Sequence, residues 1–156
     1  MNVLRRTFLK SMGAGTAMAA LVVTGLLRPL QAFAAEWNKA AFEAKDVPGA
    51  LKGLGATGAV ESKDLLLNAP TIAENGAVVP ISVVSNIPNT THIYILVDKN
   101  PFPAAVSFEF ANGALPEVAV RLKFSETATV RVIARADGKV YTTHKDVKVT
   151  AGGCGG

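Results

Sequence analysis

The sequence predicts an all-β protein, an immunoglobulin-like antiparallel β-sandwich that follows a short helical segment. Three observations support this fold class. Short runs rich in apolar and β-branched residues dominate the chain from residue 65 onward, turn residues separate these runs, and no helical pattern alternates with them. The predicted strands, about seven in number, cover residues 65–67, 77–85, 92–97, 105–110, 117–124, 128–136 and 140–150.

Clusters of turn-forming residues lie between the predicted strands. Gly, Asn, Asp and Pro favour turns because they tolerate positive φ, bond to their own backbone or fix φ. Asp137-Gly138 is a strong hairpin signal, because a two-residue Asp-Gly turn joins adjacent antiparallel strands. The clusters are Asn75-Gly76, Ile87-Pro88-Asn89, Asn100-Pro101-Phe102-Pro103, Asn112-Gly113 and Asp137-Gly138.

Two of the runs alternate as a strand with one buried face does. In residues 118–124 apolar side chains take every second position, while Arg121 and Lys123 fall on the opposite face. Residues 129–135 largely repeat the pattern. We therefore expect one face of each strand to lie in the core of the sandwich.

Residues 36–54 form the only stretch with convincing helical spacing. The Pro48-Gly49 pair is expected to break or divide this segment. An apolar stripe along the helix would consist of Trp37, Ala40, Ala41 and Phe42.

The N-terminus has the three parts of a bacterial signal peptide: a positive start, an apolar run and small residues near Ala34. Arg5 and Arg6 precede a Phe-Leu-Lys triplet, which resembles the twin-arginine export signal, although Leu4 stands where Ser or Thr is usual. A transmembrane anchor is the alternative, but the apolar run is short for a bilayer span and contains glycine. We expect cleavage near Ala34, export to the periplasm by the twin-arginine route and no membrane attachment afterwards.

These patterns divide the chain into four parts. They are a twin-arginine-type signal peptide (1–34), an N-terminal helical segment (35–64), an immunoglobulin-like β-sandwich (65–150) and a flexible glycine-rich carrier arm (151–156).

The basic charge of the chain belongs to its N-terminus. The formal net charge is +4, from 16 Lys and Arg against 12 Asp and Glu. Four of the basic residues, Arg5, Arg6, Lys10 and Arg28, precede Ala35 with no acidic residue among them. The remaining domain is therefore formally neutral, and a nucleic-acid-binding function loses its main support.

The domain offers few residues for catalysis or metal binding. It has two histidines, His92 and His144, no cysteine pair, no glycine-rich phosphate loop and no His-Glu motif. Each histidine is interpreted as a surface or packed residue, because a metal site needs several ligands. The sequence predicts no cofactor, no metal and no enzymatic activity of its own.

The single cysteine, Cys154, is the strongest functional candidate. It cannot form an intrachain disulfide, and Gly152, Gly153, Gly155 and Gly156 surround it. Glycine makes a flexible and thin tether, so this thiol could enter a narrow pocket of another protein. The alternatives are an incidental cysteine in a tail and a prenylation box, which requires a cysteine fourth from the end rather than third.

The tail and one internal segment carry a resemblance to a known family. With residues 69–76 (Ala-Pro-Thr-Ile-Ala-Glu-Asn-Gly) leading into Val78-Val79-Pro80-Ile81, and with the Gly-Gly-Cys-Gly-Gly terminus, the chain resembles the SoxY family of the periplasmic thiosulfate-oxidising system. The resemblance implies that Cys154 carries sulfur intermediates covalently on a swinging arm formed by Gly152, Gly153, Gly155 and Gly156.

The resemblance also implies partners. The chain would pair with a SoxZ-like β-sandwich subunit as a heterodimer or heterotetramer. It would dock transiently to c-type haem, hydrolase and sulfur-dehydrogenase partners, which act on the bound sulfur in turn. Thiosulfate would be joined to Cys154 oxidatively, and its sulfone group would leave as sulfate.

Two other functions compete with this hypothesis. The Gly155-Gly156 terminus is similar to that of ubiquitin-like sulfur carriers, but those are cytoplasmic, and the export signal argues against them. A non-catalytic periplasmic β-sandwich interaction module would explain the fold but leave the terminal pentapeptide unexplained. The apolar runs 78–81 and 94–97 are candidates for partner contact in either case.

Overall fold

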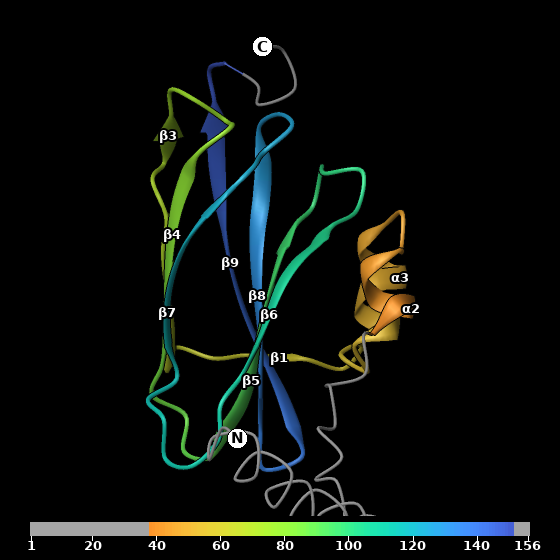
Figure 1. Cartoon of the computed structure of the whole chain (residues 1–156), viewed down its shortest axis with the longest axis vertical. Coiled ribbons are helices and arrows are strands. Elements are labelled where there is room, and N and C mark those ends of the chain that lie inside the picture. The colour runs from red at the N-terminus through yellow and green to blue at the C-terminus, as the bar shows by residue number, and fades with distance from the viewer. Residues whose placement is uncertain (1–37, 152–156) are drawn as a thin grey trace, which may run out of the picture. The chain divides into compact units, whose positions relative to one another are not determined.

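The structure, a computed structural model, describes residues 38–151. Two β-sheets pack face to face, with two short helices beside one of them (Figure 1). The helices are α2 (Lys39–Phe42) and α3 (Val47–Gly53). The strands are β1 (Val60–Glu61), β2 (Leu65–Asn68), β3 (Ile72–Ala73), β4 (Val79–Ser85), β5 (Thr90–Val97), β6 (Ala104–Glu109), β7 (Glu117–Leu122), β8 (Ala128–Ala136) and β9 (Lys139–Val149).

The topology confirms the predicted sandwich. The larger sheet has the order β1-β9-β8-β5-β6, with β3 also beside β9, and the smaller sheet has the order β2-β4-β7. Neighbouring strands are antiparallel, except that β1 and β3 both run parallel to β9. Apart from the two-residue strands β1 and β3, the larger sheet has four strands, and three strands packed on four is the arrangement of immunoglobulin-like domains.

Each of the seven predicted strands corresponds to one observed strand. The two additional strands, β1 and β3, contain two residues each. Two residues are too few to show an alternating pattern, so sequence periodicity gave no signal for them. Both are strands only because they pair with β9, β1 at Tyr141 and β3 at Lys148.

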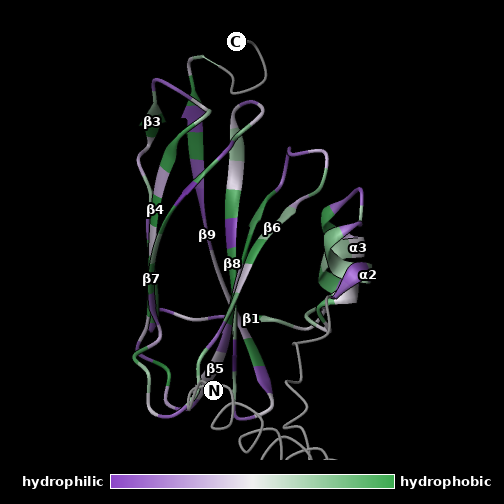
Figure 2. Ribbon diagram, in the orientation of Figure 1, coloured by the Kyte–Doolittle hydropathy of each residue, from purple (hydrophilic) through white to green (hydrophobic). Residues whose placement is uncertain are grey.

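The core lies between the two sheets. Its largest fully buried side chains include Phe124, Ile81, Ile93 and Ile95. Burial alternates along β4. Figure 2 shows both apolar and more polar stretches along its ribbon. Apolar burial between the sheets, at about 25 cal/mol per Å² removed from water, is the main stabilising contribution to such a fold.

The helical segment divides at a different place from the one predicted. The break falls between Phe42 and Val47, and Pro48 lies in the first turn of α3. Proline is tolerated there because the first helical N–H groups have no intrahelical acceptor. The side chain of Asp46 caps this helix by accepting from the Gly49 N–H at 2.7 Å. The expectation that Pro48-Gly49 breaks the helix was therefore wrong by a few residues.

The helices pack on the outer face of the larger sheet. Ala41, Ala50 and Leu54 form one apolar cluster with Leu96 of β5 and Ile133 of β8. Arg135 also donates to the Leu54 carbonyl at 2.7 Å, which ties the end of α3 to β8. No helix within residues 38–151 is long and apolar enough to cross a membrane.

We expect Gly53→Ala to destabilise the protein by about 2 kcal/mol, because overpacking of a tight contact forces the backbone apart. A Cβ at Gly53 would lie 2.5 Å from the Ala41 nitrogen and 2.7 Å from its Cα. Thermal unfolding should show a Tm lower by about 8 °C. Gly58→Ala is the matched control, since its Cβ would meet nothing within 4 Å. Equal Tm values for the two variants would contradict this account of the helix contact.

Candidate functional site: the base of the C-terminal tail

The predicted working residues lie just beyond the described structure. Cys154 and its four neighbouring glycines, Gly152, Gly153, Gly155 and Gly156, fall outside residues 38–151. The structure does describe the point from which they extend, at the end of β9. That point is at one end of the sandwich, opposite the loops that join β4 to β5 and β6 to β7 (Figure 1).

Hydrogen bonds from the β3–β4 segment hold the last two described residues. The Thr150 N–H donates to the Ala73 carbonyl at 3.0 Å, and the Gly76 N–H donates to the Ala151 carbonyl at 2.8 Å. The Thr150 hydroxyl donates to the Glu74 carbonyl at 3.2 Å. The backbone is therefore bonded as far as Ala151.

The loop between β7 and β8 contributes from the other side. The Val149 N–H donates to the Thr127 hydroxyl at 3.0 Å. The Phe124 N–H donates to the Gly76 carbonyl at 2.7 Å, so Gly76 bonds both to this loop and to the tail base. Phe124 is fully buried in the core, which couples the tail base to the centre of the sandwich. We call the bonded groups of Ala73, Glu74, Gly76, Thr127, Thr150 and Ala151 the tail clamp.

A local turn brings Gly76 to this position. The Asn75 side-chain oxygen accepts from the Ala77 N–H at 2.8 Å, an Asx turn that reverses the chain after β3. Gly76 is buried between its two hydrogen-bond partners. The sequence had marked Asn75-Gly76 as a turn, and the structure shows that this turn contacts the tail.

The surface around the tail clamp carries two exposed apolar side chains. Ile72 of β3 is 58% exposed and Val78, just before β4, is 50% exposed. Each precedes a buried residue, Ala73 and Val79 respectively. Glu74, Glu126 and Lys148 are exposed nearby in the chain segments that make the clamp. This end of the sandwich thus combines apolar and oppositely charged groups.

The two histidines lie apart from the tail clamp and from each other. His92 is on β5, opposite Arg135, and its ring stacks on Tyr94 at a centroid distance of 5.8 Å. His144 is exposed on β9, opposite Arg131. Burial raises the pKa of Tyr94, an effect that the charge of Arg135 opposes. Among residues 38–151, no three His, Cys, Asp or Glu side chains are grouped to hold a metal ion.

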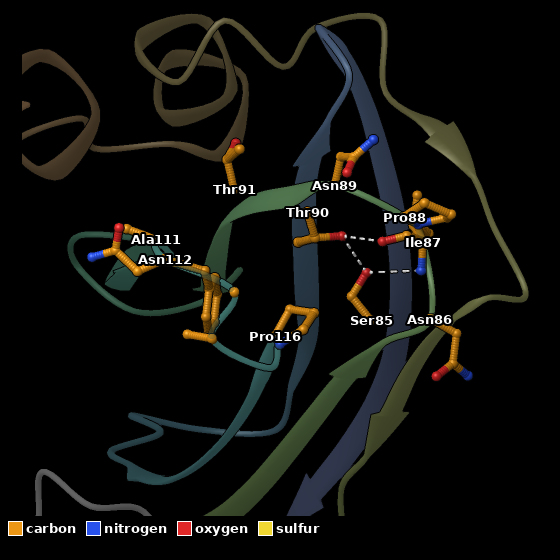
Figure 3. A pocket seen from close by; sticks show the side chains of 13 residues that line it. Ser85, Asn86, Ile87, Pro88, Asn89, Thr90, Thr91, Ala111, Asn112 and Pro116 are labelled. Atoms are coloured by element: carbon orange, nitrogen blue, oxygen red, sulfur yellow. Dashed lines mark hydrogen bonds between the residues drawn. The ribbon is translucent and has the colours of Figure 1, made fainter.

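A pocket at the opposite end of the sandwich has a mixed polar and apolar lining, and its buried hydroxyls are bonded to one another and to the backbone. The Ser85 and Thr90 hydroxyls lie 2.8 Å apart, and Thr90 also donates to the Ile87 carbonyl at 2.7 Å (Figure 3). These bonds satisfy the buried hydroxyls and fix the turn between β4 and β5. We interpret this pocket as a consequence of two adjoining turns, the second at Asn112-Gly113.

Sequence reasoning missed the residues of the tail clamp. Thr127 and Thr150 are ordinary β-forming residues in the sequence, and their contacts join segments 22 and 76 positions apart. No local pattern reports contacts at such separations. Only an indirect indication of these residues is present in the sequence. Residues 69–76 carry part of the family resemblance, but nothing in them suggests a contact with the tail.

Comparison with known proteins identifies the family of the chain. A family model described as "Sulfur oxidation protein SoxY" matches residues 52–154, well over half of the chain. Among solved structures, the sulfur carrier protein SoxY from Chlorobium limicola f thiosulfatophilum is similar, with 36% sequence identity and a TM-score of 0.62. The match covers 72% of this chain and 99% of that chain. The search of curated proteins gave no match. The chain therefore belongs to the SoxY family, which confirms the resemblance drawn from its sequence.

Proposed function

We propose that this protein is a sulfur carrier of thiosulfate oxidation that holds its intermediates on Cys154. The observation that carries the proposal is the terminal Gly-Gly-Cys-Gly-Gly sequence directly after a clamped residue, Ala151. Membership of the SoxY family and likeness to a SoxY described as a sulfur carrier support it. In this proposal residues 152–156 are the arm, and the β-sandwich is the body that presents it.

The chemistry on the thiol is a sequence of two steps. In the first, the Cys154 sulfur and the outer sulfur of thiosulfate form an S–S bond, the thiol proton leaves, and two electrons pass to a c-type haem partner. In the second, a hydrolase adds water to the terminal sulfone, which leaves as sulfate with release of two protons. The sulfane sulfur stays on Cys154 and is oxidised by a sulfur dehydrogenase or passed on.

The carrier supplies position rather than catalysis in this scheme. Two glycines, Gly152 and Gly153, lie between Ala151 and Cys154, so the cysteine is three chain steps from Ala151, a reach of about 10 Å in an extended chain. Glycines on both sides keep the arm narrow enough for a channel. Covalent attachment gives each docked partner a high effective concentration of the intermediate. The protein itself would need no cofactor.

The proposal includes the cell compartment and a permanent partner. Export of residues 35–156 to the periplasm by the twin-arginine route, after removal of residues 1–34, would bring the carrier to its enzymes. A SoxZ-like β-sandwich would form a heterodimer or heterotetramer with it.

Intact-mass measurement tests the proposal directly. The protein purified from cells supplied with thiosulfate should carry additions of sulfur or of a thiosulfonate group, located by peptide mapping on Cys154. A reductant should remove them, because each is held by an S–S bond. Protein from cells grown without thiosulfate is the control. A bare thiol during active thiosulfate oxidation would instead favour an interaction module with an incidental cysteine.

A further inference from the structure

The length of the arm limits where a partner enzyme can dock. The Cys154 Cα can lie no farther than about 10 Å from that of Ala151, and its side chain adds only a few ångströms. Residues 73–76 bond Thr150 and Ala151, and Thr127 bonds the preceding Val149, so release of further residues would require breaking those bonds. A channel that receives the thiol must therefore open beside the tail clamp.

The surface at that opening contains Ile72 and Val78. Ile72 is aligned with Lys148 in the pairing of β3 with β9, three residues before Ala151. Val78 lies two residues after Gly76, and the Gly76 N–H donates to the Ala151 carbonyl. Ile72 is 58% exposed and Val78 is 50% exposed. Each is followed by a buried, strand-paired residue, Ala73 and Val79 respectively. Both apolar side chains thus occupy fixed positions at the base of the arm.

We propose that Ile72 and Val78 form the apolar centre of the docking surface for the enzymes that act on the arm. The proposal rests on the carrier function of Cys154. Its occupant is the rim of a partner's active-site channel, which must be partly apolar and must place the reacting atom within about 12 Å of the rim. Enzymes that share the arm would share this contact, since each is held to the same short reach.

The charged residues beside the pair suit a contact that forms and breaks repeatedly. Glu74 and Lys148 are exposed with opposite signs next to Ile72 in the fold. Exposed charges at an interface rim mainly affect the rate and orientation of encounter, whereas buried apolar residues supply most of the affinity. A small apolar centre with a charged rim is therefore expected to bind weakly enough for one enzyme to replace another.

The test compares Ile72→Ser/Val78→Ser with Leu115→Ser. Leu115 is 80% exposed and lies in the β6–β7 connection at the opposite end of the sandwich, so it controls for loss of an exposed apolar side chain. Carrier concentration is varied in thiosulfate-dependent cytochrome c reduction with the purified partner enzymes from the same organism. The double variant should raise the KM for the carrier about tenfold with little change in kcat, because each apolar residue at the centre of an interface contributes severalfold to the affinity. Leu115→Ser should leave KM unchanged.

Two further measurements separate the possible outcomes. In the double variant, the rate of Cys154 alkylation by iodoacetamide and the Tm should match those of the unaltered protein. If the Tm of the serine variant falls, Ile72→Thr/Val78→Thr replaces it, because threonine keeps the branched Cβ that favours extended backbone. An unchanged KM in a folded double variant would overturn the docking proposal. If Cys154→Ser still oxidised thiosulfate, the carrier function itself would fail, an outcome independent of the KM result.

Discussion

Replacement of Cys154 by serine is expected to reduce thiosulfate-dependent activity to below about 1% of that of the unaltered protein, because an alcohol cannot replace the thiolate as nucleophile. A serine oxygen forms no stable bond to the sulfane sulfur, so no intermediate would be held between enzymes. The rate of thiosulfate-dependent cytochrome c reduction by the reconstituted system measures this loss.

The serine variant should retain its fold. Residue 154 lies beyond the clamped Ala151 in sequence, and the core is built from residues of the sandwich. Its Tm should therefore stay within about 1 °C, since substitutions outside packed regions have small effects. Carboxamidomethylated protein of unaltered sequence is a second control and should be equally inactive. Sustained turnover by either form would show that the thiol is not the carrier group.

Deletion of Gly152 and Gly153 is expected to lower kcat/KM with each partner enzyme at least about 100-fold, because correct positioning of the reacting atom carries a large part of the rate. The deletion removes about 7 Å of a reach of about 10 Å. The thiol would then follow directly on Ala151, whose carbonyl is bonded to Gly76. Steady-state kinetics with the purified enzymes provides the measurement.

Reach and flexibility can be separated by a variant of equal length. Replacement of Gly152-Gly153 by Ala-Ala preserves the contour length but restricts the backbone and widens the arm. We expect it to lose less activity than the deletion. Alkylation by a small reagent should be similar in all three proteins, since it needs no channel. Unaltered kinetics in the deletion variant would contradict this account, because the enzymes would then reach the thiol without the length of the arm.

The sequence predicted the long strands because each has a face in the core. The alternation of residues 118–124 and the Asp137-Gly138 turn correspond to β7 and to the β8–β9 hairpin. β1 and β3 escaped prediction because their position depends on β9 rather than on their own residues. The helix break was misplaced because a proline in the first turn of a helix is compatible with that helix.

In the candidate site, too, features of a short stretch of sequence could be predicted and contacts between distant residues could not. Cys154 was identifiable because four glycines around a lone cysteine are conspicuous without any structure. The tail clamp was not identifiable, because the bonds of Thr127 to Val149 and of Gly76 to Ala151 join residues far apart in the sequence. The apolar runs 78–81 and 94–97 were expected to contact a partner. In the first run Val78 is exposed but Val79 and Ile81 are buried in the core, and most of the second run is buried in β5.

The long pairing of β9 has a mechanical consequence for a protein whose tail is pulled. β9 is paired with β8 from Lys139 to Val147, and its other edge is held by β1 and β3. Because the tail continues from the end of β9, tension applied along the strand direction loads these hydrogen bonds together in shear. Tension directed across the sheet would instead open them one at a time. Withdrawal of the arm along the axis of β9 would therefore leave the terminal strand in place.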